Sequence, residues 1–263
     1  MSQASSSRSF ARWKTAIREH RFDVLLLSLL LLMASAPVVH ALWPTGRLLA
    51  AHLSMLALFA LMLLSAVLAA CQRRREVIIA LWLAVPGFLF DAAGLLGNHV
   101  GLATLGHLFE TCFLGYTAAL ILRMVFAAER VTLNMVWASA CVYLLLGVLF
   151  ANVYSLMDVI HPGSFYFTFA GDAEQEAMRL GGGQSVYPLY YSFVTITTLG
   201  YGDIVPITGP TRMLATVEAL TGQLYLAVLV ARLVGMHISQ AASSRPGGLP
   251  GRDHKQEDSG HGD

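Results

Sequence analysis

The chain has 263 residues, of which 56% are hydrophobic and only 13% are charged, and its mean hydropathy is +0.62. A soluble domain carries about 25% charged residues, so this composition is that of a membrane protein and not of a soluble domain. The formal net charge of +1 offers no support for a nucleic-acid partner, and we expect none.

Residues 1–22 form a polar and basic N-terminal segment that precedes the first apolar segment. Basic residues beside an apolar segment are typical of a cytoplasmic anchor. The apolar segment from Val24 to about Trp43 is long enough to span a bilayer, which takes about 20 residues. The triplet Ala34-Ser35-Ala36 leaves an alternative open, in which residues 1–41 are a cleaved signal peptide. Pro37 disfavours that cleavage, and we expect the segment to be retained.

Five further apolar segments follow along the chain. They run from Leu48 to Cys71, Val77 to about Gly97, about Leu102 to Val125, Val131 to about Met157, and about Arg212 to Ser239. With both termini in the cytoplasm, most Lys and Arg residues fall on the cytoplasmic side, as expected for a multi-pass protein of the cell membrane. Pro86-Gly87 predicts a kink in the third segment.

The three cysteines and the C-terminal tail carry little functional information. Cys71, Cys112 and Cys141 lie within or at the ends of apolar segments, so we expect neither a disulfide framework nor a metal site from them. Residues 240–263 are rich in Ser, Gly, Pro and charge, which predicts a disordered cytoplasmic tail.

Polar residues occur inside the third and fourth apolar segments. Asp91 and Glu110 fall at nearly the same depth of the membrane, and His107 lies one helical turn from Glu110. Such a group could sense protons or bind a divalent metal. We prefer a structural role, in which these residues hold the two helices together.

The most informative stretch is Thr197-Thr198-Leu199-Gly200-Tyr201-Gly202-Asp203. An apolar, hydroxyl-rich run from Tyr190 to Thr197 precedes it and is typical of a short re-entrant helix. Successive backbone carbonyls can replace the water shell of a cation only if they point to one axis, which requires unusual φ/ψ values at alternate positions. Gly200 and Gly202 can supply those values at little steric cost.

This stretch resembles the selectivity filter of the potassium-channel superfamily, with Leu199 where Val is usual. The resemblance implies an all-α membrane protein with six transmembrane helices and a re-entrant pore helix between helices five and six. It implies that potassium is the permeant ion, with no cofactor and no enzymatic activity. The ion would be bound by Thr198, Leu199, Gly200, Tyr201 and Gly202, with Thr197 and Asp203 as support. Since the chain supplies one filter, the resemblance implies a homotetramer in the lipid bilayer.

Two residues of the last segment lie one helical turn apart. Gly222 lies at the position where channels of this superfamily place a hinge glycine, and we favour a gating hinge over the alternative of a close-packing glycine. Glu218 is an ionisable residue inside a span, where a charged side chain is costly unless it is paired or has a function. We expect it to brace the region behind the filter or to pair with Arg212 or with a hydroxyl such as that of Thr195.

The resemblance also predicts how the chain divides into domains. Residues 23–130 would form a four-helix domain like a voltage sensor, residues 131–239 the pore domain, and 1–22 and 240–263 the cytoplasmic ends. The fourth segment carries no basic residue before Arg123, so we expect weak intrinsic voltage dependence.

Two alternatives to a potassium-selective channel remain open. A non-selective monovalent cation channel is favoured by Leu199. A potassium-uptake transporter subunit would carry four filter-like loops in one chain, and the single loop argues against it. A membrane sensor would need a signalling domain, which the short tail does not provide.

Overall fold

The computed structural model describes residues 20–34, 48–97, 99–171 and 187–243. The basic segment up to residue 19, residues 35–47, the acidic stretch that begins at Asp172 and the tail beyond residue 243 lie outside the described residues. The first described helix covers residues 20–33, followed by α3 (Leu48–Ala70), α4 (Arg74–Gly97), α5 (Val100–Ala127) and α6 (Leu133–Ile160). After α6 come β1 (Phe165–Phe167), α8 (Tyr187–Ile196), β2 (Ile204–Pro206) and α9 (Gly209–Ser243).

Within the described residues, four helical stretches are long and apolar enough to cross a membrane. They are Arg74–Gly94, Val100–Ala127, Leu133–Ile160 and Gly209–Ser239. The described part of α3 adds a shorter apolar stretch, Leu56–Ala70. The helical character of the chain is therefore confirmed, and four of its described helices are able to span a membrane by length and composition, while the count of six spans stays a prediction.

Side chains satisfy the free amide groups at the starts of α4 and α6. The Glu76 carboxylate accepts hydrogen bonds from the amides of Gln72 and Arg73 at 2.7 and 3.0 Å. The hydroxyl of Thr132 accepts from the amide of Met135 at 3.3 Å. The first amides of a helix have no partner within the helix, so these contacts fix where the two helices begin.

Glycines allow α4 and α5 to pack closely. A Cβ atom added at Gly94 would lie 2.9 Å from the amide nitrogen of Ala103, and one at Gly106 would lie 2.8 Å from that of Asp91. Small residues at a helix interface let the backbones approach in a membrane. α4 continues as one helix past Pro86, and the packing against α5 brings Asp91 next to the polar part of that helix.

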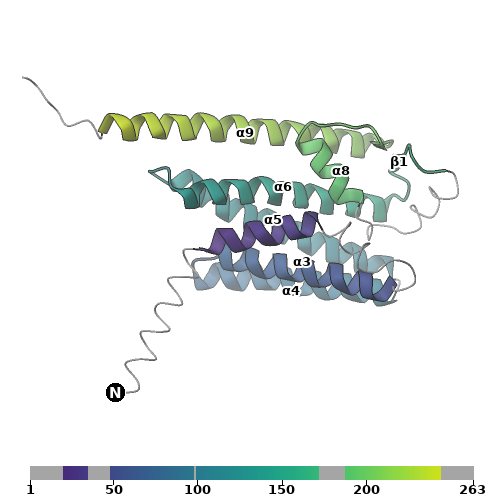
Figure 1. Ribbon diagram of the computed structural model, residues 1–263. Helices are drawn as coiled ribbons and strands as arrows, with labels where there is room; N and C mark the ends of the chain where they lie inside the picture. Colours follow the sequence, from purple (N-terminus) through teal and green to yellow (C-terminus); the bar gives the residue numbers. More distant parts are fainter. Residues whose placement is uncertain (1–19, 35–47, 98, 172–186, 244–263) are drawn as a thin grey trace, which may run out of the picture.

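The helices lie side by side, with α3 and α4 at one edge and α9 at the other (Figure 1). α5 packs against α3 and α4, α6 packs against α5, and the short α8 lies between α6 and α9. The start of helix 20–33 and the end of α9 lie at the same end of the bundle (Figure 1).

A two-stranded antiparallel sheet forms where α8 begins, and it departs from a purely helical fold. In it Tyr166 of β1 pairs with Val205 of β2. Each strand has three residues, too few to give a recognisable alternating pattern in the sequence. The sheet joins the segment after α6 to the segment before α9. It therefore fixes the chain immediately after residues 197–203.

Candidate functional site

The short helix α8 is anchored to α6 by close contacts along its length. The hydroxyl of Ser192 donates to the carbonyl of Gly147 at 2.6 Å. A Cβ atom added at Gly147 would lie 2.7 Å from the ring of Phe193. At the C-terminal end of α8, the carbonyl of Ile196 accepts from the phenol of Tyr143 at 3.2 Å. These contacts fix the orientation of α8 and therefore the position of residue 197, which follows it.

The backbone after α8 has left-handed φ angles at every second residue. The φ angles are 57° at Thr198, 59° at Gly200 and 75° at Gly202. Thr198 is the one non-glycine residue with positive φ among the described residues, a conformation that L-residues rarely adopt. The sequence predicted unusual values at the two glycines, and the alternation extends one position further back.

The amides that begin this stretch turn back onto α8. The amide of Thr198 donates to the carbonyl of Thr195 at 2.9 Å. The amides of Leu199 and Gly200 both donate to the carbonyl of Val194, at 2.9 and 3.2 Å. Within the described part of the chain, the backbone carbonyls of residues 198–202 accept no hydrogen bond. The donors are therefore used internally, and a row of carbonyl oxygens is left available to a ligand.

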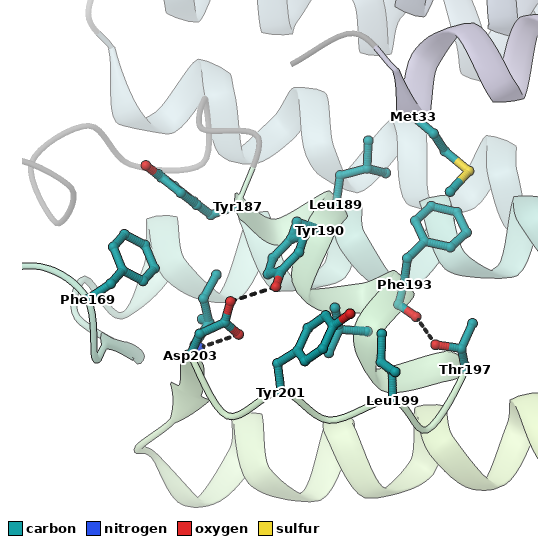
Figure 2. A pocket seen from close by; sticks show the side chains of 12 residues that line it. Met33, Phe169, Tyr187, Leu189, Tyr190, Phe193, Thr197, Leu199, Tyr201 and Asp203 are labelled. Atoms are coloured by element: carbon teal, nitrogen blue, oxygen red, sulfur yellow. Dashed lines mark hydrogen bonds between the residues drawn. The ribbon is translucent and has the colours of Figure 1, made fainter. Parts of the chain in front are cut away.

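Asp203 joins the end of this stretch to α8 and to β1. Its carboxylate accepts from the phenol of Tyr190 at 2.6 Å and from the amide of Ile204 at 3.0 Å (Figure 2). Its carbonyl accepts from the amide and the hydroxyl of Thr168 at 2.9 and 3.1 Å. The stretch is thus held at both ends, by α8 before it and by Asp203 after it.

An open apolar cavity of about 640 Å³ lies beside the stretch. Figure 2 shows Leu199 and Tyr201 on this cavity together with Phe193 and Tyr190 of α8, and Met33 of the first described helix lies at its edge. The side chains of Leu199 and Tyr201 are 55% and 67% exposed. Exposed apolar side chains that gather at one place are typical of a contact with lipid or with another protein surface.

α9 contributes two contacts immediately below the stretch. A Cβ atom added at Gly222 would lie 2.5 Å from the carbonyl oxygen of Ile196. The side-chain amide of Gln223 donates to the hydroxyl of Thr198 at 3.2 Å. Gly222 is thus in tight contact with the C-terminal end of α8, which is the close-packing interpretation. A hinge at Gly222 stays a prediction.

Glu218 lies one turn earlier in α9 and is fully buried. It contacts the phenol of Tyr154 and the hydroxyl of Ser192. The sequence suggested Arg212 or Thr195 as its partner. Arg212 instead donates to the carbonyl of Pro206 at 3.0 Å, and the hydroxyl belongs to Ser192, which shares the buried face of α8.

The polar residues of α4 and α5 form a buried cluster that reaches α6. The imidazole of His107 lies 3.7 Å from the Glu110 carboxylate, and Asn152 of α6 donates to that carboxylate at 3.0 Å. Asp91 packs against Gly106. Among the described residues, no group of three or more His, Cys, Asp or Glu side chains is placed to hold a metal ion. These contacts join α5 to α6, and the role of the cluster stays a prediction.

Several contacts of the site could not have been found from the sequence alone. Tyr190, Gln223 and Tyr154 are ordinary residues in apolar helices, and no spacing rule singles them out. The one available signal was the hydroxyl-rich character of the run before residue 197. It indicates that side chains there serve contacts within the protein, but not which ones.

A family of ion-channel domains, described as "Ion channel", matches residues 131–238. Protein LctB of Bacillus caldotenax is 33% identical over 134 residues, which cover 48% of this chain and 95% of that protein. This chain belongs to the ion-channel family and thereby to the potassium-channel superfamily.

Other comparisons give the channel a second relative but no structural one. Two-pore potassium channel 4 of Arabidopsis thaliana is 46% identical over 50 residues, 19% of this chain and 18% of that protein. No solved structure matches. The ion-channel match begins just before α6 and includes α8, residues 197–203 and most of α9, but not the first described helix, which carries Met33.

Proposed function

We propose that four copies of the chain form a potassium-selective channel, in which residues 198–202 bind the ion. The observation that carries this proposal is the alternation of left-handed φ angles at Thr198, Gly200 and Gly202. Together with amides that bond back to α8, it leaves successive carbonyl oxygens free to replace the water shell of an ion. The name of the Arabidopsis relative, a potassium channel, favours potassium as that ion.

The tetramer is required because one chain supplies one row of carbonyls. A ring of ligands around an ion needs several rows, which closed rotational symmetry supplies. The exposed apolar side chains beside the site support such an assembly, because neighbouring copies would cover them. They include Leu199, Tyr201, Leu220, Leu224 and Val228.

In this channel the helix at residues 20–33 and α3 would complete six spans, with α8 entering the membrane and turning back. Residues 23–130 would form the four-helix domain and residues 131–239 the pore domain. Both termini would lie in the cytoplasm of a bacterial cell, and this is supported by the start of the first described helix and the end of α9, which lie at the same end of the bundle (Figure 1).

We also propose that the channel opens with little dependence on voltage. Steep voltage dependence needs 3–4 gating charges per subunit within the membrane. The helix in the position of a sensor is α5, and its one Lys or Arg residue is Arg123, near the C-terminal end. A domain without such charges moves little charge across the membrane when the pore opens.

Ion flux from liposomes that contain the purified protein tests the proposal, with potassium and sodium compared and Gly200→Ala beside the wild type. An alanine at φ 59° costs roughly 1–2 kcal/mol in backbone strain, although its Cβ would meet no atom within 4 Å. We expect potassium flux to fall to the level of protein-free liposomes, because relief of the strain turns a carbonyl away from the ion.

Gly115→Ala is the matched control, since Gly115 of α5 also has open space around its Cβ position and has no left-handed φ. It should conduct like the wild type. Equal sodium and potassium flux in the wild type would support the non-selective channel that Leu199 suggests. Flux that survives Gly200→Ala would contradict the assignment of the ion-binding residues.

A further inference from the structure

The buried carboxyl group of Glu218 lies where three elements of the pore domain meet. Its side chain is 0% exposed. It projects from α9 between Tyr154 of α6 and Ser192 of α8. One residue of α9 therefore contacts both α6 and α8, the helix that leads into the proposed ion-binding stretch.

The hydrogen bonds around Glu218 can be counted by the protons that they need. Tyr154 Oη lies 2.6 Å from Glu218 Oε2, and Ser192 Oγ contacts Glu218 Oε1. Ser192 Oγ also lies 2.6 Å from the carbonyl oxygen of Gly147. Each of these three oxygen–oxygen contacts requires one proton between its two atoms.

Ser192 cannot supply the proton for both of its contacts. A backbone carbonyl has no proton to give, so the single hydroxyl proton of Ser192 points at Gly147. The Tyr154 phenol supplies the proton of its own contact. The remaining contact, between Ser192 Oγ and Glu218 Oε1, then needs a proton that only Glu218 can carry. The geometry corresponds to a neutral carboxylic acid that donates to Ser192 and accepts from Tyr154.

The surroundings of Glu218 agree with a neutral side chain. Among the described residues no Arg, Lys or His forms an ion pair with it. The other titratable groups within electrostatic reach are phenols: Tyr143 and Tyr154 of α6 and Tyr191 of α8. A buried carboxylate without a cation is strongly disfavoured, whereas a carboxylic acid with both oxygens hydrogen-bonded is not.

We propose that Glu218 is a protonated positioning residue, whose proton links α9 to α8 and so keeps the ion-binding stretch in place. The inference rests on the proposed function, because α8 can affect ion selectivity only if residues 198–202 bind the ion. Without the proton, Ser192 must choose between Glu218 and Gly147. One of the two hydrogen bonds through which Ser192 anchors α8 is then lost, and the channel loses selectivity as the pH rises.

The proton itself is tested by infrared spectroscopy of the wild-type protein and of Glu218→Gln at neutral pH. The carbonyl band of a protonated carboxyl group is separate from the carboxylate bands. Asp91 and Glu110 contribute equally to both spectra, so the difference isolates Glu218. We expect the wild type to show a protonated band that Glu218→Gln lacks. Spectra that differ only in the carboxylate region would overturn the proposal, and this holds whether or not the protein conducts.

The positioning role is tested by the selectivity of liposome flux as a function of pH. Glutamine offers one donor and one acceptor, as a protonated glutamate does, so Glu218→Gln should keep most of the selectivity. Its selectivity should also stay constant at the alkaline pH where that of the wild type falls. Glu218→Ala should lower the potassium-to-sodium ratio at least about tenfold, the effect of one lost buried hydrogen bond.

Two outcomes would contradict the positioning role. An alkaline fall that persists in Glu218→Gln would assign it to the neighbouring phenols. A glutamine variant that folds but loses selectivity like the alanine variant would mean that the carboxyl group acts as an anion. If the wild type itself conducts sodium and potassium equally, the proposed function fails, and the infrared result still decides the state of Glu218.

Discussion

At the scale of single residues, Gly222 holds α9 against the end of α8. A methyl group at this position would meet the carbonyl oxygen of Ile196 at 2.5 Å and its Cγ1 atom at 2.7 Å. We expect Gly222→Ala to destabilise the protein by about 1–3 kcal/mol, the usual effect of overpacking, because Ile196 must move to make room. The thermal unfolding temperature in detergent measures the loss.

Gly235→Ala is the matched control in the same helix, since nothing lies within 4 Å of its Cβ position. Alanine is the better helix former, so this variant should unfold at or above the wild-type temperature. A pure hinge role for Gly222 makes the opposite prediction, a stable Gly222→Ala protein with altered opening. Unchanged stability in Gly222→Ala would therefore favour the hinge.

The residues around the proposed ion-binding stretch differ in how far the sequence determines their conformation and contacts. Gly200 and Gly202 could be placed at left-handed positions because few other residues tolerate them. Thr198 has the same left-handed conformation, with φ 57°, but a threonine in the sequence does not predict it. Its amide is bonded to Thr195, and its hydroxyl lies between Thr197 and Gln223. Such contacts depend on how α8 and α9 meet.

At the scale of elements, Arg232 ties α9 to the corner between α5 and α6. Its guanidinium donates to the carbonyls of Phe126 and Ala128 at 2.7 and 2.8 Å and lies over the Phe126 ring. We expect Arg232→Ala to destabilise the protein by about 1–2 kcal/mol. Hydrogen bonds from a charged donor are stronger than neutral ones, but the partial exposure of the guanidinium reduces their contribution. Hydrogen exchange at Phe126 and Ala128 should speed up.

Two variants separate this contact from a general effect of charge. Arg232→Lys keeps the charge but loses the forked donor geometry, so it should recover only part of the stability. Arg130→Ala removes an exposed arginine from the same corner and should change little. Equal losses in Arg130→Ala and Arg232→Ala would contradict the specific role of Arg232.

The elements themselves were predictable where apolar runs are long. The expected segments from Leu48 and from Leu102 differ from α3 and α5 by two residues or fewer at each end. β1 and β2 were missed because their stability comes from pairing with each other and not from a local pattern. The contact between Glu110 and Asn152 was missed for a related reason: hydropathy places both residues inside helices but does not say which faces meet.

At the scale of the whole molecule, most of α9 is without a partner in a single chain. Its exposed apolar residues lie along one face of the helix and include Val217, Leu220, Leu224, Val230 and Val234. Only 11% of the membrane-spanning window of this helix is buried, whereas α6 is half buried in its own chain. One face of α9 packs on α6 and α8, and we propose that other copies of the chain cover its exposed face and complete the pore.

This dependence predicts that potassium stabilises the assembled protein. A ligand that binds only the folded assembly adds RT ln(1 + [L]/Kd) to its stability, about 2.7 kcal/mol at one hundred times Kd. Because the ion site proposed at residues 198–202 would be complete only in a tetramer, the oligomer should dissociate at a higher temperature in potassium than in the same concentration of sodium. Gel filtration after heating measures this difference. Gly200→Ala should abolish it and Gly115→Ala should keep it, while equal temperatures in both salts for the wild type would contradict a selective site at the subunit junction.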